Sequence, residues 1–389
     1  MDLRLTAEQQ LLRQSIREFA ESRVRPYVME WDEAEGFPPT LVPELAALGL
    51  LGVQVAEQYG GSALSTLDYC ICIEELARVD PSVALSVAAH NGLCVAHLER
   101  FGSDAQKARY LAPLASGKSL GAWGLTEAGA GSDAGAMKTA ARRDGDGWVI
   151  SGSKQFITHG RIGGTIIVMA VTDAARRHHG ISAFVVARGA EGFSAGKKER
   201  KLGMRASDTS EVIFQDCRVP ADALVGVEGE GFSAALQVLD AGRVGIAALA
   251  VGLAQGAFEA ARRYAGERRQ FGHPISQFQA IQWKLADMAT RISAARLLTY
   301  RAAWLKDTHS EGRSVTSSMA KLYSSEIAVR AAEESVQIHG GYGFVKDYPA
   351  EKYFRDVKLC TIGEGTSEVQ RLVIARHLLG TSPRGDVAR

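Results

Sequence analysis

The hydrophobic pattern of this chain changes twice, and these changes constrain its fold more than any other feature. Before about residue 120, apolar residues recur at helical spacing, as in the series Leu12, Ile16, Phe19 and Ala20. From 121 to about 226, short β-rich runs are separated by glycine, and after Gly229 the helical spacing returns and persists. The order α, β, α predicts an α+β protein with a helical region at 1–120, an antiparallel or barrel-like β region at 121–226 and a helical region at 227–389.

Caps and turn residues place the individual elements. Thr6 and Gln9 form the pattern of a capping box at the start of the first helix. Further helices are expected at 39–49, 67–79, 82–101, 232–269, 280–306, 315–339, 350–359 and 366–379. Strands are expected at 147–150, 165–171, 181–186 and 211–219.

Composition excludes several classes of protein. The 389 residues are 46% hydrophobic and carry a formal charge of +1, which argues against disorder and against a broad nucleic-acid or membrane-binding face. The longest apolar stretch, 244–254, is about half of the ~20 residues that span a bilayer. The N-terminus has no signal or transit character, and five cysteines form no disulfide framework, so we expect a cytoplasmic protein with reduced thiols.

Several apparent motifs do not carry the chemistry they suggest. The sequence Gly117-Lys118-Ser119 ends like a phosphate-binding loop, but Ala112 stands where that motif needs glycine. The glycines at 129–131 and 340–343 do not fit G-x-G-x-x-G between a strand and a helix, so a Rossmann site has no support. The histidine pair at 178–179 lacks carboxylate or cysteine partners for a metal.

Two stretches in the β region are suited to binding a ligand. Small residues and hydroxyls at 123–133 follow a probable strand and leave backbone N–H groups free for a polar group, although a tight turn explains them equally well. Phe156 and Thr158 lie two residues apart in an expected strand and therefore point to one face. That arrangement suits stacking on a flat ring and hydrogen bonding to its edge, but an ordinary strand shows the same pattern.

A third stretch, 362–368, places the carboxylate of Glu364 between two glycines, in a loop that opens a helix capped by Thr366 or Ser367. The glycines leave room for a substrate, and the helix start supplies N–H donors to an oxyanion or phosphate. The alternative is an exposed loop acid or a carboxylate that only complements the helix dipole.

Together these stretches resemble the acyl-CoA dehydrogenase family over nearly the whole chain. The resemblance is carried by LTE (125–127) with GSD (131–133), RRQFG (268–272), QIHGGYG (337–343), YP (348–349), EK (351–352), RD (355–356) and GEGTSEVQR (363–371). It implies an N-terminal helical domain (1–120), a central β-barrel-like domain (121–226) and a C-terminal four-helix bundle (227–389). It also implies a homotetramer in which FAD lies between the last two domains and reaches a neighbouring subunit.

The resemblance implies roles for single residues. Phe156 would pack on the isoalloxazine, and Thr158 would donate to flavin N5. The implied cofactor-binding residues are Trp123, Leu125, Thr126, Ser132, Phe156, Ile157, Thr158, Arg268, Phe271, Gln279, Gln337, Gly340, Gly341, Thr366, Ser367 and Glu368. Of these, Arg268, Gln279 and the segment 337–341 are expected at the neighbour's FAD. The implied substrate-binding residues are Ser132, Asp240, Arg243 and Gly365, and no metal is implied.

The implied reaction is α,β-dehydrogenation of an acyl-CoA thioester to the trans-2-enoyl-CoA. Removing the weakly acidic α-proton needs a positioned base, for which Glu364 is the candidate, and stabilisation of the thioester oxygen, here by the Glu364 N–H and a ribityl hydroxyl. Hydride would pass from the β-carbon to flavin N5, and electrons would go on to electron-transferring flavoprotein. Burial by substrate is expected to raise the pKa of Glu364.

Three departures from the family pattern bear on this reading. Gly242 stands where some members carry the base, which favours Glu364. Gly363 replaces a common tyrosine before the base, and the space it leaves could admit a branched acyl group. His159 replaces a common asparagine, and the sequence offers no explanation for it.

Two other functions on the same fold stay open. An acyl-CoA oxidase would let O₂ reoxidise the flavin, but such oxidases commonly have longer chains. A DNA-associated flavin-binding member would not turn over acyl-CoA; the retained Glu364 and the formal charge of +1 weigh against it.

Overall fold

The computed structural model describes residues 4–380. Its N-terminal part is helical, with α1 (Ala7–Phe19), α2 (Val28–Ala34), α3 (Leu41–Ala47), α4 (Thr66–Val79), α5 (Pro81–Ala89), α6 (Ala96–Phe101), α7 (Asp104–Gln106) and α8 (Ala112–Ala115). The predicted capping box is confirmed, since Thr6 and Gln9 exchange side-chain and backbone hydrogen bonds of 3.1 and 3.2 Å.

The helix expected at 82–101 is not a single regular α-helix. Between α5 and α6 the turns of His90–Val95 widen to a π-helix, a form that often marks functional sites. Asn91 holds this widened segment against the preceding loop, because its Nδ2 donates to the carbonyl of Leu50 at 2.8 Å. Hydrophobic spacing alone cannot distinguish such a bulge from continuous α-helix.

The central part forms an eight-stranded sheet within the described residues, in the order β6-β7-β3-β2-β4-β5-β8, with β1 paired to β4. Its strands are β1 (Gly121–Gly124), β2 (Ala140–Asp144), β3 (Gly147–Thr158), β4 (Thr165–Val171), β5 (Ile181–Ala187), β6 (Phe193–Lys198), β7 (Thr209–Pro220) and β8 (Leu224–Val225). Most pairs are antiparallel, but β4 pairs in parallel with both β1 and β2. The sheet is therefore mixed.

The sequence patterns gave no bounds for β1, β2 and β6, and they indicated β3 only in two pieces, at 147–150 and around Phe156 and Thr158. Those three strands are short and rich in glycine or charge, so they lack the alternation that marks β4 and β5. Register shifts in β3 between Ile150 and Gly152 and between Lys154 and Ile157 break its pattern into two pieces.

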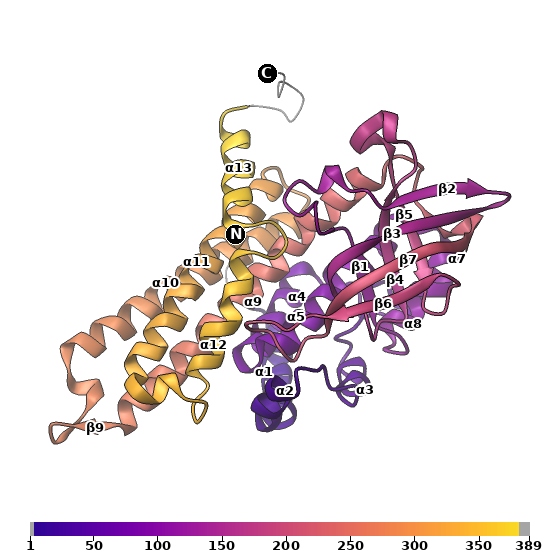
Figure 1. The fold of residues 1–389 in the computed structure, drawn as a ribbon. Helices are drawn as coiled ribbons and strands as arrows, with labels where there is room; N and C mark the ends of the chain where they lie inside the picture. Colours follow the sequence, from indigo (N-terminus) through magenta and orange to yellow (C-terminus); the bar gives the residue numbers. More distant parts are fainter. Residues whose placement is uncertain (1–3, 381–389) are drawn as a thin grey trace.

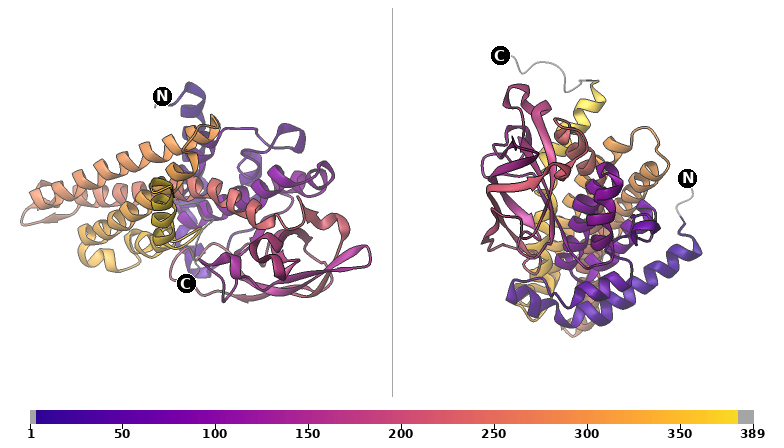
Figure 2. Two further views of the ribbon diagram at one scale, coloured as in Figure 1. Left: turned by 90° about the horizontal axis from the view of Figure 1, so that it is seen from above. Right: turned by 90° about the vertical axis from the view of Figure 1, so that its right-hand side faces the viewer.

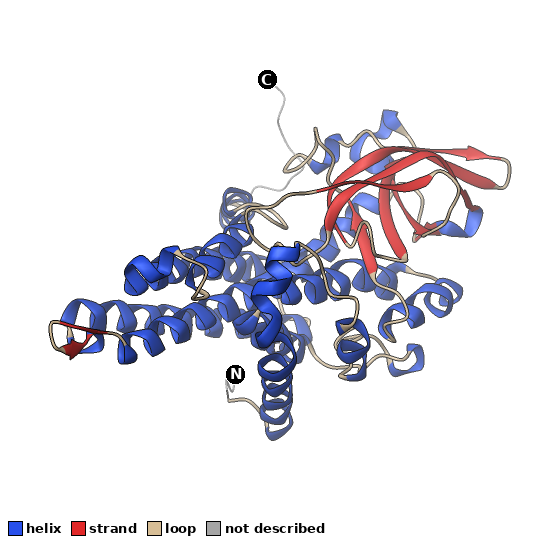
Figure 3. Cartoon of the chain, turned by 60° about the horizontal axis from the view of Figure 1, so that its bottom comes forward, coloured by secondary structure: helices blue, strands red, loops and turns tan. Residues whose placement is uncertain are grey.

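The C-terminal part contains α9 (Gly231–Glu267), α10 (Gln279–Asp307), α11 (Arg313–His339), α12 (Ala350–Asp356) and α13 (Ser367–Leu378). The chain turns between α9 and α10 through a small hairpin of β9 (Arg269–Gln270) and β10 (His273–Pro274). Figure 1 shows this hairpin at the end of the bundle farthest from the sheet, and Figure 2 shows the same separation from above. Figure 3 shows that the strands of the central sheet gather on one side of the molecule, while the two short hairpin strands lie at the opposite end.

Helix α9 is the centre of the helical core. It packs against α4, α10 and α11, and the segment from Val244 to Ala254 is buried throughout. By length and composition α9 alone among the described helices could cross a membrane, but 78% of its apolar window is buried inside the protein. Its hydrophobicity is that of a core helix.

Candidate active site

Glu364 lies in the loop between the 3-10 turn Val357–Thr361 and helix α13. Its backbone has a φ of 53° and that of Gly365 a φ of 89°, so two successive residues adopt the left-handed region. For a glutamate this conformation is strained and is held in place by its surroundings. Thr366 then caps α13 by accepting from the Val369 N–H at 3.3 Å, which confirms the predicted start of that helix.

The carboxylate of Glu364 points toward the middle of α9. Although the residue is partly exposed as a whole, its Oε2 atom is shielded from solvent and has no hydrogen-bond partner among residues 4–380. A Cβ built on Gly242 would lie 2.3 Å from this Oε2, so the missing side chain of Gly242 makes the space that the carboxylate occupies. Burial raises the pKa of Glu364 to about 7, against the opposing attraction of Lys321 and Arg243.

Lys321 on α11 braces the loop that carries Glu364. The lysine is fully buried, and its Nζ donates to the carbonyl oxygen of Gly365 at 2.5 Å. Gln370 on α13 donates to the same carbonyl at 3.0 Å. Burial lowers the pKa of Lys321 to about 8, with nearby Glu364 acting in the opposite direction. The loop is thus fixed by two side chains immediately after Glu364.

The predicted substrate-binding residues on α9 lie beside the same loop. Arg243 is buried, and its Nη1 donates to Asp240 and to the Ser318 hydroxyl. Asp240 also accepts from Ser314 at 2.8 Å, and its side chain remains 38% exposed. Arg243 and Asp240 therefore extend from the buried carboxylate of Glu364 toward the surface.

The second group of predicted residues lies in the β domain. Trp123 in β1 and Leu125 just after it are buried, Thr126 is half-buried, and Ser132 is exposed in the following loop. The indole N–H of Trp123 donates to His97 Nδ1 at 3.2 Å, which connects β1 to α6.

Phe156 stands out on β3 because its ring is 65% exposed and its φ is 59°. It lies in the register shift between Lys154 and Ile157, where the strand bulges. Ile157 is buried and Thr158 half-buried, so burial alternates as predicted although the backbone is not regular. Because it is so exposed, Phe156 is not a core aromatic, and its ring is available to a planar ligand.

A buried ion pair between Lys154 and Glu127 fixes the loop after β1. Lys154 is fully buried, and its Nζ donates to Glu127 Oε1 at 2.7 Å and to the Leu125 carbonyl at 3.2 Å. Glu127 in turn accepts from the backbone N–H groups of Lys138 and Thr139. Burial lowers the pKa of Lys154 to about 8.

His159, which the sequence alone does not explain, has a structural role. Its Nδ1–H donates to the carbonyl of Gly121 at 3.0 Å, while the Gly121 N–H donates to His90 Nδ1 at 2.9 Å. Both rings are fully buried, and burial lowers the pKa of each, of His90 to about 3. Two neutral histidines therefore hold the first residue of β1, next to Thr158.

A third group of predicted residues lies far from Glu364. Each of its members is exposed and lies either between the end of α9 and the start of α10 or at the end of α11: Arg268, Phe271, Gln279, Gln337, Gly340 and Gly341. Their exposure and their distance from the sheet separate them from the β-domain residues of the same chain. The ring of Phe271 is 90% exposed, and that of Phe344 is 88% exposed.

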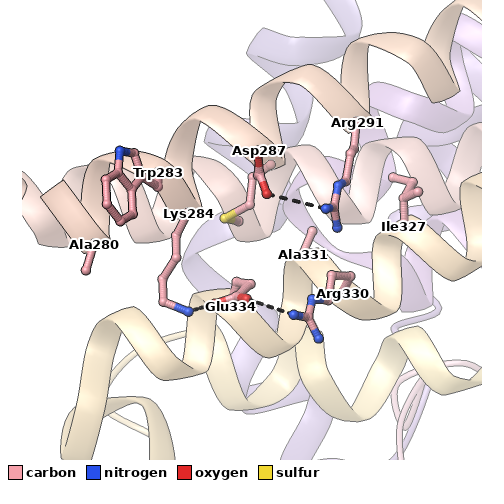
Figure 4. Close-up of a pocket in the computed structure, with 10 residues that line it drawn as sticks. Ala280, Trp283, Lys284, Asp287, Arg291, Ile327, Arg330, Ala331 and Glu334 are labelled. Carbon is pink, nitrogen blue, oxygen red and sulfur yellow. Dashed lines mark hydrogen bonds and ion pairs between the residues drawn. The ribbon is translucent and has the colours of Figure 1, made fainter.

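A pocket between α10 and α11 lies beside this third group but contains none of the predicted residues (Figure 4). Trp283 lines its rim, and Glu334 accepts from Lys284 and faces Arg330 across 3.6 Å. Its charged groups are thus largely paired with each other. We assign it no part in the chemistry at Glu364.

The start of α13 offers unpartnered polar atoms. Ser367 Oγ and Gln370 Oε1 are buried without a hydrogen-bond partner in the described part of the chain, while Glu368 is exposed. The exposed ring of Phe156 suits stacking on a flat ligand, and the unpartnered atoms of Ser367 and Gln370 suit polar groups of a ligand. Residues 4–380 contain no cluster of histidine, cysteine and carboxylate groups that could hold a metal ion.

Sequence reasoning missed Lys321, Lys154 and Tyr69, a buried tyrosine of α4 near Glu364. A lysine within the buried small-residue face of α11 was the available signal for Lys321. No local pattern marks Lys154 or Tyr69, because their partners are far away in the sequence.

Family models match the chain almost from end to end. The N-terminal, middle and C-terminal domains of acyl-CoA dehydrogenase match residues 6–118, 122–217 and 229–379. The chain belongs to the acyl-CoA dehydrogenase family. It is thus an acyl-CoA dehydrogenase, and the enzymes of this family depend on FAD.

Individual relatives agree with this assignment. The short-chain specific acyl-CoA dehydrogenase of Clostridium acetobutylicum is 46% identical over 96% of this chain and 99% of its own length. The butyryl-CoA dehydrogenase structure from Megasphaera elsdenii has a TM-score of 0.95 at 42% identity, covering 97% of this chain and 100% of that one. A chain in a structure of the electron transferring flavoprotein of Acidaminococcus fermentans has a TM-score of 0.96 at 46% identity, with coverage of 97% and 100%.

Proposed function

We propose that this acyl-CoA dehydrogenase acts on short-chain acyl-CoA thioesters and that Glu364 removes the α-proton. The observation that carries the proposal is the buried, unpartnered Oε2 of Glu364, held opposite the bare backbone of Gly242. A carboxylate that only stabilised the fold would have a partner for this atom. The short-chain preference rests on the relatives named above.

A pKa of about 7 suits Glu364 to general-base catalysis near neutral pH. The carboxylate form accepts the proton, and the buried setting strengthens its basicity once substrate covers it. By the family resemblance, the Glu364 N–H polarises the thioester oxygen. FAD, when bound, supplies the acceptor for the hydride that leaves the β-carbon, and the product is the trans-2-enoyl-CoA.

Only one carboxylate has room at this point. Because an added Cβ at Gly242 would overlap Glu364 Oε2, a base on α9 and a base at 364 would occupy the same space. With glycine at 242, no side chain there can replace Glu364. The geometry supports the expectation that the base is carried by the loop before α13.

The predicted cofactor and substrate contacts are part of the proposal. Trp123, Leu125, Thr126, Phe156, Ile157 and Thr158 would bind the flavin part of FAD, and Thr366, Ser367 and Glu368 would bind its phosphates and sugar. Ser132, Asp240, Arg243 and Gly365 would face the CoA thioester. The exposed ring of Phe156 and the unpartnered Ser367 Oγ support these roles.

The third group of predicted residues would serve a neighbouring subunit. Arg268, Phe271, Gln279, Gln337, Gly340 and Gly341 are exposed and remote from the sheet of their own chain. Large exposed rings such as Phe271 and Phe344 are unusual on a monomer and favour burial by another copy. We therefore propose a homotetramer in which these residues contact the FAD of a second chain.

Electrons would then pass to electron-transferring flavoprotein. The likeness to a chain in the structure of such a flavoprotein supports this acceptor over O₂. The fold gives no separate evidence for the oxidase or for the DNA-associated alternative. A cytoplasmic location stays a prediction.

Gly363 leaves space beside the base. An added Cβ there would make only ordinary contacts, the nearest with Leu359 at 3.5 Å. A branched acyl group near the α-carbon is thus a possible second substrate, and isobutyryl-CoA tests it.

The test is anaerobic reduction of the purified yellow holoenzyme by butyryl-, isobutyryl-, hexanoyl- and octanoyl-CoA, followed as loss of flavin absorbance. We expect rapid bleaching by butyryl-CoA, and reoxidation that is fast with electron-transferring flavoprotein and slow with O₂. Absence of bleaching by every thioester would refute the proposed activity, and fast O₂ reoxidation would favour the oxidase.

A further inference from the structure

Three glycines line the region between Glu364 and Tyr69 along one face of α9, and we call this glycine-lined region the path. Gly242 faces Glu364, and an added Cβ at Gly245 would lie 2.7 Å from the Tyr69 hydroxyl and 3.1 Å from its ring. Gly92 lies in the π-helical segment. A Cβ added there would lie 3.3 Å from the same Tyr69 hydroxyl and 3.7 Å from the Cα of Gly242. Three bare backbone positions from two elements thus converge on the space between the carboxylate and one tyrosine.

Tyr69 ends this path. It lies on α4, is 2% exposed, and its hydroxyl donates to the Ala88 carbonyl at 3.3 Å. Gly242 and Gly245 are three residues apart, so they share a face of α9 and are separated by about 4.5 Å along its axis. The phenol therefore lies about one helical turn from the proton-abstracting group.

The path leads to the apolar end of the substrate. On the N-terminal side of Gly242, Asp240 is partly exposed and Leu236 is 45% exposed, whereas from Arg243 to Ala254 the helix is buried. The charged CoA moiety belongs on the exposed side because its phosphates must stay hydrated. The acyl chain then extends into the buried side, toward Gly245 and Tyr69.

We propose that Tyr69 closes the acyl end of the site and sets the upper limit of acyl-chain length. Only a few acyl carbons fit between Glu364 and the ring of Tyr69, which lies about one helical turn away. Leu93 narrows the same space, because its side chain lies 3.5 Å from a Cβ added at Gly242. The inference rests on the proposed function, because it takes Glu364 as the point where the α-carbon lies.

A second tyrosine, Tyr353 on α12, also packs against α9 and provides a matched control. Tyr353 packs on Gly256 of α9 with its hydroxyl 2.6 Å from the added Cβ, and this hydroxyl donates to the Arg78 carbonyl at 2.7 Å. Like Tyr69 it is a buried tyrosine against a glycine of α9. Gly256 lies eleven residues beyond Gly245, about 16 Å along the helix, so Tyr353 is well removed from the base.

The experiment compares kcat/KM for butyryl-, hexanoyl- and octanoyl-CoA in the wild type, Tyr69→Ala and Tyr353→Ala holoenzymes. Tyr69→Ala is expected to raise the octanoyl-to-butyryl ratio at least tenfold, while Tyr353→Ala leaves it unchanged. Tyr69→Phe removes only the hydroxyl and should keep the wild-type ratio. If an alanine variant does not fold, Tyr69→Leu and Tyr353→Leu replace the pair and are expected to differ in the same direction.

The outcomes separate the two claims. If the wild type reduces no acyl-CoA, the proposed function fails before the inference is reached. If the wild type prefers butyryl-CoA but folded Tyr69→Ala or Tyr69→Leu keeps that ratio, Tyr69 does not set the limit. An equal shift in the Tyr353 variant would mean that loosening the core, and not opening the path, changes the preference.

Discussion

Two buried lysines in the helical core face carboxylates in contrasting ways. Lys352 on α12 donates to Asp80 at 2.9 Å and to Asp356 at 2.6 Å, and Asp356 also accepts from the Met204 N–H at 2.5 Å. Two carboxylates hold the ammonium, so the pKa of Lys352 is raised well above its usual value. Lys321 instead donates to a backbone carbonyl and leaves Glu364 Oε2 without a partner in the described chain.

The difference separates a cluster whose buried charges satisfy each other from one that leaves a carboxylate oxygen without a partner among the described residues. Paired buried charges satisfy each other and connect α12 to the start of α5. At Glu364 the lysine fixes the loop but not the carboxylate, whose pKa therefore rises to about 7 while that of Lys321 falls to about 8. An ionisable group kept buried and unpartnered costs stability and gains reactivity.

The largest expected effect is on stability at the paired cluster around Lys352. Lys352→Met leaves two buried aspartates without their cation and should lower the free energy of unfolding by about 3–5 kcal/mol. Lys321→Met removes one of two donors to the Gly365 carbonyl and should cost about 1 kcal/mol. Urea unfolding of both apoproteins measures this difference; equal losses would contradict the contrast.

The next effect is on pH dependence. Because the carboxylate is the active form, kcat/KM for butyryl-CoA should fall tenfold per pH unit below about 7 and level off above it. Lys321 holds the pKa of Glu364 down, so Lys321→Met should move this limb to higher pH. A limb that stays in place in Lys321→Met would mean that the lysine does not act on the base.

A smaller effect is expected on the pH dependence of protein stability, through Glu364. The folded state holds the Glu364 proton between pH 4.5 and about 7, where the unfolded chain has released it, so stability falls as pH rises through this window. Glu364→Gln lacks this cost and should be about 1–3 kcal/mol more stable than wild type above pH 7. Thermal unfolding at pH 5 and pH 8 gives the comparison, and the gain should be confined to pH 8.

The smallest effect concerns the β domain. Phe156→Ala removes an exposed ring, so it should weaken FAD retention by about 1 kcal/mol with little change in apoprotein stability. A core ring would instead cost about 3–5 kcal/mol of stability. Isothermal titration of the apoprotein with FAD, beside its urea midpoint, distinguishes these cases.

The sequence was sufficient for the α, β, α order, because long amphipathic helices such as α10 and α11 and buried strands such as β4 carry strong periodic patterns. It also drew attention to Glu364 as a candidate base, since a carboxylate between glycines before a capped helix is a local signal. The residues that surround Glu364 are not close to it in the sequence. Gly242, Lys321 and Tyr69 come from three helices, and only the packing of those helices brings them to one carboxylate.

The irregular elements also depend on contacts between residues that are distant in the sequence. The left-handed Phe156 and the π-helical His90–Val95 are fixed by pairing and packing with distant residues rather than by their own side chains. Likewise, the role of His159 depends on its hydrogen bond to Gly121 of β1, which lies 38 residues away in the sequence.

The most direct test is anaerobic stopped-flow reduction of the flavin by butyryl-CoA in wild type, Glu364→Gln and Glu364→Asp. Glutamine keeps the size of the side chain but cannot accept the proton, so FAD content and acyl-CoA binding should persist while the reduction rate falls by about 10²–10⁴-fold. Glu364→Asp should lie between, because the shorter acid is basic but too far from the α-carbon. Reduction of Glu364→Gln at a rate near that of wild type would show that another group removes the proton.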